Sequence, residues 1–237
     1  MNERKKKILK ISVKEHIKTA KPVASDVLYS KYKLGISPAT IRHEFFDLEE
    51  EGYLFQPHTS SGRVPLDKGY RFFIDDILDN FSMEDTLNQE IERWRRNVRD
   101  YDFLDSISEI LSEETGVLGL AGSLNSGKIA RSGMKQLFLQ PDFYSNEDFM
   151  EMGDTIERME KQFLEFVDDL FNDGKEDFRV FIGNENPFGM AEKFTFMVSS
   201  FKHKKDRSAM IIMGPKRMHY RRNLQAIKEL QKAINEF

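Results

Sequence analysis

The 237-residue sequence contains no cysteine, which excludes disulfides, cysteine-ligated zinc and a thiol nucleophile. It also lacks any apolar run approaching the ~18 residues that cross a bilayer. No apolar stretch of roughly 7–15 residues follows the basic start, so the sequence indicates no signal peptide. We therefore expect a cytoplasmic protein that makes no membrane contact.

Arrangements that carry catalysis are also missing. The five histidines show no metal-ligand spacing, and no nucleophile lies in a recognisable pattern with a base. We expect a protein that is not an enzyme, with no catalytic residue, no metal site and no cofactor.

One segment resembles a nucleotide site. Residues 122–128 (GSLNSGK) match most of the phosphate-binding pattern G-x-x-x-x-G-K-[ST] and follow a strand-like run. The next residue, Ile129, has no hydroxyl for magnesium, and Ser132-Gly133 interrupts the helix that should begin there. We interpret the segment as a Gly/Ser turn.

Charge is distributed unevenly along the chain. Residues 1–42 contain 11 Lys and Arg against 3 Asp and Glu, a net charge of +8, whereas the remainder carries −12. A basic first fifth joined to an acidic body is typical of a polyanion-binding module attached to a part that does not touch the polyanion. A solubilising lysine-rich helix would give a similar pattern.

The first 80 residues show a clear order of predicted elements. Lys21-Pro22 ends the first helix, Ser37-Pro38 begins the third, and Gly52 ends that third helix. The expected elements are helices at about 3–19, 25–33 and 37–52, a strand at about 53–55, a polar loop at 56–63 and a helix at about 67–78. This order predicts a winged helix-turn-helix domain over residues 1–80.

The remainder of the chain is predicted to fold separately. Apolar residues at spacings of three and four favour a helix over about 83–112, either at a dimer seam or packed on its own chain. We assign 81–115 as a helical linker that could serve as a dimer helix. After Gly116, strand-like runs alternate with helices, which predicts an α+β domain over 116–237. The strands are expected at about 117–120, 137–139, 178–182, 195–199 and 209–213, and the helices at about 146–171 and 220–235.

The third predicted helix has the features of a recognition helix. At 100° per residue, Ile41, Phe45 and Leu48 form a buried stripe, and Ala39 and His43 lie opposite. The N-terminal residues of such a helix reach base edges in the major groove. Phe46 lies outside the buried stripe and could either pack on the following helix or touch DNA.

Each proposed contact residue has matching chemistry. Arg42 can pair bidentately with guanine, Thr40 can donate or accept, and the Ala39 methyl can touch a thymine methyl. The loop at 56–63 can lie along the backbone or place Arg63 in the minor groove. The predicted DNA-binding residues are Lys5, Lys6, Ser37, Ala39, Thr40, Arg42, His43, His58, Thr59, Ser60 and Arg63.

Several segments resemble the HrcA family of bacterial heat-inducible transcription repressors. The first half matches at residues 21–23 (KPV), 37–42 (SPATIR), 47–49 (DLE), 52–54 (GYL), 56–65 (QPHTSSGRVP) and 67–71 (DKGYR). The second half matches, in the same order, at residues 111–116, 133–143, 182–186 and 213–220. The loop at 56–65 is the most specific of these, and coverage is nearly end to end.

The resemblance implies a function and partners. It implies binding of a homodimer to double-stranded DNA at an inverted-repeat operator, the CIRCE element, upstream of chaperone genes, with release on heat stress. It also implies a GAF-like C-terminal domain, activity supported by the GroEL chaperonin, and a place at the bacterial nucleoid. The expected fold class is therefore α+β, with a winged helix-turn-helix, a helical linker and a reduced GAF-like α/β domain.

The chain departs from the family pattern at three places. The middle region, residues 117–132, is much shorter than usual, so the GAF-like sheet should be reduced. His43 stands where the family usually has asparagine, and Phe46 where it has a small residue.

The alternative function is a ligand-responsive winged-helix regulator whose C-terminal domain binds a small molecule.

Overall fold

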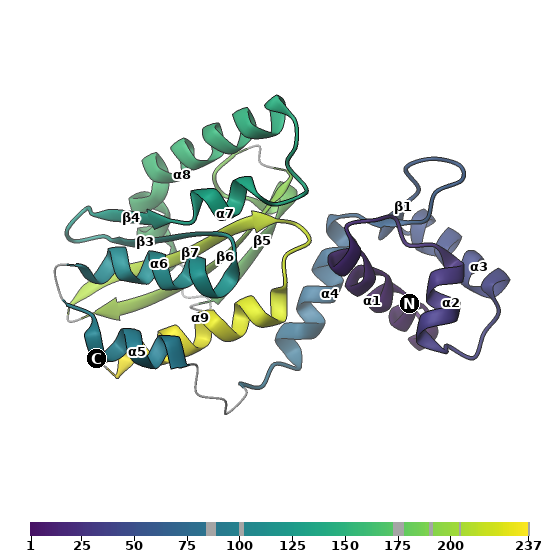
Figure 1. Ribbon diagram of the computed structural model, residues 1–237, viewed down its shortest axis with the longest axis horizontal. Coiled ribbons are helices and arrows are strands. Elements are labelled where there is room, and N and C mark those ends of the chain that lie inside the picture. Colours follow the sequence, from purple (N-terminus) through teal and green to yellow (C-terminus); the bar gives the residue numbers. More distant parts are fainter. Residues whose placement is uncertain (84–88, 100–101, 173–177, 190–191, 204, 237) are drawn as a thin grey trace. The chain divides into compact units, whose positions relative to one another are not determined.

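The computed structural model describes residues 1–83, 89–99, 102–172, 178–189, 192–203 and 205–236. The chain divides into two compact units, Met1–Phe81 and Ser82–Phe237 (Figure 1). Each unit has its own elements and its own buried side chains.

The first unit is mainly helical. In chain order it consists of α1 (Glu3–Thr19), α2 (Ser25–Tyr32), α3 (Pro38–Glu50), β1 (Leu54–Phe55), β2 (Val64–Pro65) and α4 (Asp67–Asp79). Local signals explain the starts of two of the helices, because Asn2 caps α1 and Ser37 caps α3 through side-chain oxygens that accept hydrogen bonds from backbone N–H groups. Helices α2 and α4 begin without a side-chain cap. The bounds closely follow the elements expected from the sequence.

A small core holds these helices together. Helix α1 packs against α3 and α4, and α2 packs against α3. The residues at the centre are almost completely buried: Ile8, Leu9, Val13, Leu28, Ile41, Leu48, Leu54 and Ile74. Burial of Ile41 and Leu48 on one side of α3 determines which side of that helix is exposed.

Gly62 permits a close approach between two segments of the first unit. Val23 and Arg63 exchange two backbone hydrogen bonds, of 2.8 and 2.9 Å, just before α2 and β2 begin. A Cβ atom on Gly62 would lie 2.3 Å from the carbonyl carbon of Val23, a distance that no side chain can tolerate. Glycine at this position therefore lets the end of the β1–β2 loop dock beside the start of α2.

The second unit is a mixed α/β structure. Its elements are α5 (Gln89–Asn97), α6 (Phe103–Thr115), β3 (Leu118–Ser123), β4 (Ile129–Ser132), α7 (Met134–Phe138), α8 (Asn146–Asn172), β5 (Phe178–Ile182), a 3-10 turn at Gly183–Glu185, β6 (Phe194–His203), β7 (Asp206–Pro215) and α9 (Tyr220–Asn235). The strands form a five-stranded antiparallel sheet in the order β4-β3-β7-β6-β5.

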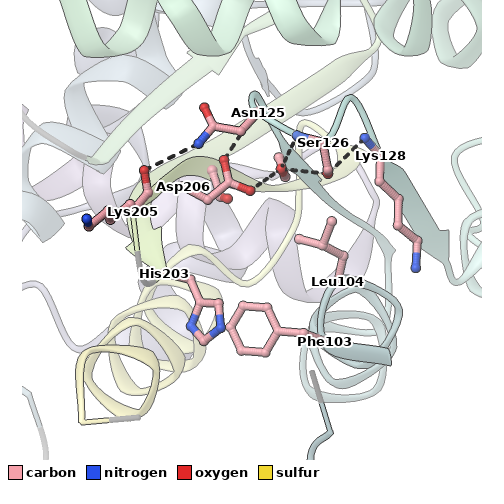
Figure 2. A pocket seen from close by; sticks show the side chains of 10 residues that line it. Phe103, Leu104, Asn125, Ser126, Lys128, His203, Lys205 and Asp206 are labelled. Carbon is pink, nitrogen blue, oxygen red and sulfur yellow. Dashed lines mark hydrogen bonds between the residues drawn. The ribbon is translucent and has the colours of Figure 1, made fainter. Parts of the chain in front are cut away.

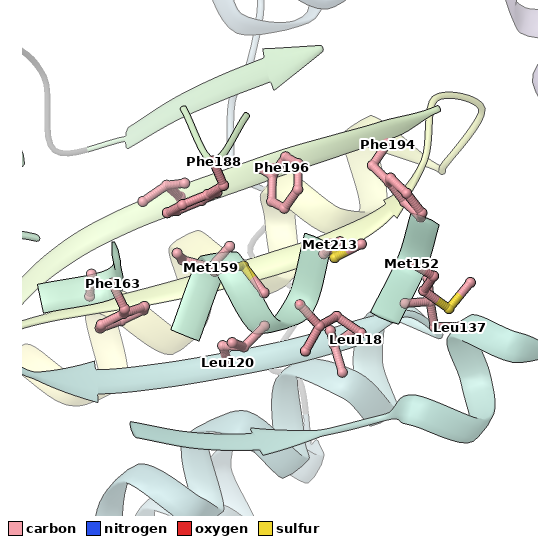
Figure 3. Close-up of a cluster of buried hydrophobic side chains, with 14 of the residues drawn as sticks. Leu118, Leu120, Leu137, Met152, Met159, Phe163, Phe188, Phe194, Phe196 and Met213 are labelled. Atoms are coloured by element: carbon pink, nitrogen blue, oxygen red, sulfur yellow. The ribbon is translucent and has the colours of Figure 1, made fainter. Parts of the chain in front are cut away.

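Helices cover both faces of this sheet (Figure 1). Helices α7 and α8 lie on one face, and α6 and α9 lie on the other. Figure 3 shows the first interface, where Met159 and Phe163 of α8 meet the strand residues Leu120 and Phe196. Strand residues alternate between the two faces of the sheet. Because helices cover both faces, almost every position of β3, β6 and β7 is buried.

The structure corrects one predicted strand. Residues 137–139 were expected as a strand, but Leu137 and Phe138 belong to helix α7. The strand that pairs with β3 is β4, from Ile129 to Ser132. A three-residue apolar run does not separate strand from helix by periodicity, and Gly133, with φ of 94°, turns the chain into α7.

The structure also divides the helix expected over 83–112. Two helices, α5 and α6, occupy this region, and both fall within the second unit rather than in a separate linker. Eight of the 13 residues of α6 are buried, and the helix packs on β3, β4 and α9. The apolar spacing thus reflects packing within the chain.

Among the described residues, no helix is long and apolar enough to cross a membrane.

Replacement of a central aromatic side chain should destabilise the second unit selectively. Phe163 is fully buried, so Phe163→Ala should lower the free energy of unfolding of this unit by about 3–5 kcal/mol. The control is Met150→Ala on the same helix, because Met150 is 69% exposed. This substitution should change the free energy of unfolding by less than about 0.5 kcal/mol. Hydrogen exchange in urea would report each unit separately, and equal effects of both substitutions would contradict the described core.

Candidate nucleic-acid interface

One side of α3 carries a continuous line of exposed residues. Ala39, Arg42, His43, Phe46 and Glu50 are exposed and fall within an arc of about 100° around the helix axis. We call these five residues the exposed stripe of α3. Ile41, Phe45 and Leu48 are buried on the opposite side, as the angular analysis predicts.

The start of α3 is ordered by its own side chains. The Ser37 hydroxyl oxygen accepts the Thr40 N–H at 3.1 Å and lies 3.0 Å from the Thr40 hydroxyl. Both predicted contact residues therefore define the helix start. Pro38 has no N–H and the Ile41 N–H donates to the Ser37 carbonyl oxygen, so the Ala39 N–H and the helix dipole are what this end offers to an anion.

The β1–β2 loop, residues 56–63, is tied together by short-range hydrogen bonds. The Gln56 side-chain amide donates to the backbone oxygens of Thr59 and Ser61, both at 2.9 Å. The Ser61 hydroxyl donates to the His58 carbonyl oxygen at 2.7 Å. As a result, His58, Thr59 and Ser60 form an ordered and exposed tip.

Glu49 attaches this loop to α3. One carboxylate oxygen accepts the Gln56 backbone N–H at 2.8 Å, and the other pairs with the Arg63 guanidinium at 2.9 Å. The Arg63 side chain is only 13% exposed. Arg63 therefore lies against α3 and does not project from the loop in the way that insertion into a minor groove would require.

A cleft of about 320 Å³ lies beside the exposed stripe. Its lining comes from three segments, the start of α2, Arg42 with Phe45 of α3, and the loop from Gln56 to Arg63. Arg42 makes no ion pair with any residue that the structure describes, so its guanidinium is available to a ligand. Asp26 also lines the cleft and opposes an anion near α2.

The two lysines predicted from α1 differ in their surroundings. Lys5 pairs with Asp47 at 3.0 Å and Glu51 at 2.7 Å, and its side chain is 12% exposed. These hydrogen bonds, that to Glu51 first, raise the pKa of Lys5. Lys6 is more open and pairs with Glu3 at 2.8 Å. Lys5 therefore joins α1 to the end of α3.

Much of the positive charge of residues 1–42 is neutralised within the first unit. Lys10 pairs with Asp76, and Arg4 approaches Glu44 at 3.7 Å. Other cations make no ion pair with a described residue; these are Lys7, Lys14, Lys18, Lys21, Lys33 and Arg42. The unpaired cations, rather than the whole cluster, are available for a polyanion.

A buried carboxylate fixes α1 against α2. The Glu15 side chain accepts hydrogen bonds from the Lys31 ammonium at 2.7 Å and the Tyr32 hydroxyl at 2.5 Å. These bonds, that of Lys31 first, lower the pKa of Glu15. Burial and then the hydrogen bond to Glu15 raise the pKa of Tyr32 to about 12. This cluster holds α2 in place, and α2 in turn supports α3.

The segment that resembles a nucleotide site forms the β3–β4 hairpin (Figure 2). The Asp206 carboxylate accepts hydrogen bonds from the Ser123 hydroxyl and from the Asn125 N–H, the latter at 3.1 Å. Lys128 pairs with Asp105. Strand β4 follows the turn, so the segment lacks the helix start that cradles phosphate in a P-loop.

Beside this turn lies a second cleft of about 460 Å³. Phe103, Leu104 and His203 line one side, with the Phe103 and His203 rings stacked at 4.0 Å, and the hairpin residues line the other (Figure 2). No group of three or more potential metal ligands occurs among the described residues.

Comparisons with known proteins agree with the family resemblance. The family model described as HrcA protein C terminal domain matches residues 70–224. The chain is 42% identical over 143 residues to the heat-inducible transcription repressor HrcA of Desulfitobacterium hafniense, covering 60% of this chain and 41% of that protein. It is 58% identical over 85 residues to the protein of the same name from Caldanaerobacter subterraneus subsp. tengcongensis, covering 36% and 25%. The matched part is thus less than half of these relatives' length.

One solved structure shares the fold. A crystal structure described as a hypothetical protein at 2.2 Å resolution superposes with a TM-score of 0.81 at 18% identity. The superposition covers 100% of this chain and 98% of the other.

The Glu15 cluster predicts an acid-sensitive contribution to stability. The pKa of Glu15 in the folded state lies below its ordinary value of 4.5. Ionised Glu15 therefore stabilises the first unit fully above about pH 4.5, and this stabilisation is lost as the pH falls through the lowered pKa. Glu15→Gln should lower the free energy of unfolding of the first unit at pH 7, and the difference from wild type should narrow below about pH 4.5.

The control is Glu157→Gln, which alters an exposed pair with Lys161 in the second unit. Urea unfolding at several pH values, followed by hydrogen exchange, would measure both variants. A Glu15→Gln deficit that stays constant down to pH 3 would contradict the assigned ionised state.

Proposed function

The chain belongs to the HrcA family of heat-inducible transcription repressors, and from this premise we propose that it is a sequence-specific DNA-binding repressor of chaperone genes. Its first unit acts as a winged helix-turn-helix, and its second as a reduced GAF-like domain. The single observation that carries the proposal is the exposed stripe of α3, which presents the unpaired Arg42 beside an ordered loop.

In this proposal the N-terminal half of α3 enters the major groove. Arg42 pairs bidentately with a guanine, and the Ala39 methyl contacts a neighbouring base. The His43 side chain is 78% exposed on the same stripe, so we assign it to the same groove; its Nδ1 lies 3.5 Å from an Asp47 carboxylate oxygen. A phosphate approaches the helix start at Ser37 and Thr40, where the Ala39 N–H, the two hydroxyl groups and the helix dipole favour it.

The remaining predicted residues divide into contact and positioning roles. His58, Thr59 and Ser60 lie along the DNA backbone from the loop tip, and Lys6 supplies charge at longer range. Arg63 and Lys5 act through their pairs with Glu49, Asp47 and Glu51, which set the loop and α1 against α3. We assign these two as positioning residues.

The protein acts as a homodimer on an inverted repeat of the CIRCE type at the nucleoid. The two-fold symmetry of the dimer then matches that of the DNA, with α3 of each protomer on one half-site. Because the two protomers are linked, binding of both helices gives a higher affinity than binding of one. Heating releases the DNA by loosening the second unit, whose exposed apolar surface is then available to the GroEL chaperonin.

A second candidate function rests on the cleft beside the β3–β4 hairpin. Its apolar side at Phe103 and Leu104 and its polar side at Ser126 would suit a small amphipathic molecule that regulates DNA binding. A library screen for ligands that raise the melting temperature of the second unit would support this function. Such ligands should fail to stabilise a Leu104→Glu variant.

Arg42→Ala should reduce sequence discrimination. On the preferred operator the loss should be about 1–3 kcal/mol, with relaxed base preference at one position in each half-site, because a bidentate contact to guanine is removed. Competition titrations against scrambled DNA would measure it, with Lys161→Ala of the second unit as the control. An Arg42→Ala variant with unchanged operator preference would contradict the assigned reading role.

Lys33→Gln should weaken binding to every sequence alike. Lys33 lies in the turn between α2 and α3 and has no ion pair with a described residue, so it can meet a phosphate. The slope of log affinity against log salt concentration should fall by about 1. Lys5→Gln should leave that slope unchanged because Lys5 is already paired. Equal slopes for wild type and Lys33→Gln would remove Lys33 from the interface.

A further inference from the structure

Phe46 occupies an unusual position on α3. It lies near the middle of the exposed stripe, between Arg42 and Glu50, and its side chain is 58% exposed. It has no ring contact with any aromatic residue that the structure describes. Of the two roles that the sequence left open, the 58% exposure argues against burial of Phe46 on the following helix.

The neighbours of Phe46 make its exposure informative. Arg42 and His43 lie on the preceding turn of the same face, and both are exposed and polar. Other exposed apolar residues of the first unit, such as Tyr29 and Phe55, lie on α2 and β1. A single exposed apolar residue is ordinary by itself, but the stripe on which Phe46 lies is the one that the proposed function places against DNA, so DNA binding would cover this ring.

The distances along the helix suit a DNA ligand. At a rise of about 1.5 Å per residue, Phe46 lies about 6 Å along the axis from Arg42 and about 10 Å from Ala39. The major groove, about 12 Å wide, admits the whole diameter of a helix, so a recognition helix that lies in the groove keeps position 46 of its exposed stripe near the base edges.

We propose that Phe46 is a specificity-determining residue that contacts the 5-methyl group of a thymine in each half-site. The inference rests on the proposed function and names one further element of its recognition code. The phenyl ring has no hydrogen-bond donor or acceptor, and the thymine methyl is the apolar group that base edges present in the major groove.

The contact has a measurable size. Removal of one methyl group from a buried contact corresponds to about a fourfold change in affinity, or about 0.8 kcal/mol. With two symmetric half-sites occupied, the full inverted repeat should show about a fifteenfold change.

Deoxyuridine provides the test because it differs from thymidine only by the missing methyl. The probe is the inverted repeat that the full chain selects from random duplex DNA, with uracil placed at one symmetric pair of thymine positions at a time. The affinity of the wild type for the inverted repeat should fall about fifteenfold when uracil replaces thymine at one such pair. Phe46→Ala should bind the thymine and uracil forms of that pair alike, and any loss from the Ala39 contact at another pair should persist.

Two further variants complete the experiment. Phe46→Leu keeps an apolar contact and should retain part of the discrimination at the same pair. Leu139→Ala is the control, since Leu139 is 71% exposed in the second unit, and should behave as wild type. Because Phe46 is exposed, thermal unfolding of Phe46→Ala should match that of wild type.

The outcomes separate the two hypotheses. Equal binding of thymine and uracil forms by wild type, or undiminished discrimination by Phe46→Ala, overturns the methyl contact and leaves the proposed function intact. If Phe46→Ala weakens the thymine and uracil forms by the same factor relative to wild type, the ring is assigned to the sugar-phosphate backbone and the methyl contact is again overturned. Failure of the chain to select any sequence overturns the proposed function itself.

Discussion

The carboxylate of Glu49 connects the two parts of the candidate interface. It accepts the Gln56 backbone N–H at the start of the β1–β2 loop and pairs with Arg63 at the end. Both ends of the loop are thereby held by the same helix that carries the exposed stripe. A loop held this way moves with α3, so its tip and the stripe can contact one ligand without a separate ordering cost.

Ion pairs on the other side of α3 extend the same arrangement. Lys5 bonds to Asp47 and Glu51, and the Glu15 cluster supports α2. These ion pairs neutralise positive charge of residues 1–42 that the composition alone would make available to a polyanion. The available charge is therefore concentrated on a few unpaired side chains, Arg42 and Lys33 among them, and the proposed DNA specificity depends on their placement more than on the total.

Local signals account for how well the first unit could be predicted. Ser37 caps the start of α3, and Gly52, with φ of 74°, follows its end. Both signals depend only on neighbouring residues, so the sequence alone places α3 and its buried stripe. The partners of Arg63 and Lys5 could not be predicted, because Lys5 meets carboxylates 42 and 46 residues away that only the tertiary fold brings close. The same limit explains the errors at 137–139 and 83–112, where apolar spacing alone did not reveal the packing partner.

Selection of binding sites from random duplex DNA by the full chain tests the central claim most directly. The account predicts enrichment of an inverted repeat whose two half-sites are centred one helical turn, about 10–10.5 base pairs, or a multiple of it apart. Enrichment of a single unpaired half-site would contradict the dimer, and the absence of any enriched sequence would contradict DNA reading by α3.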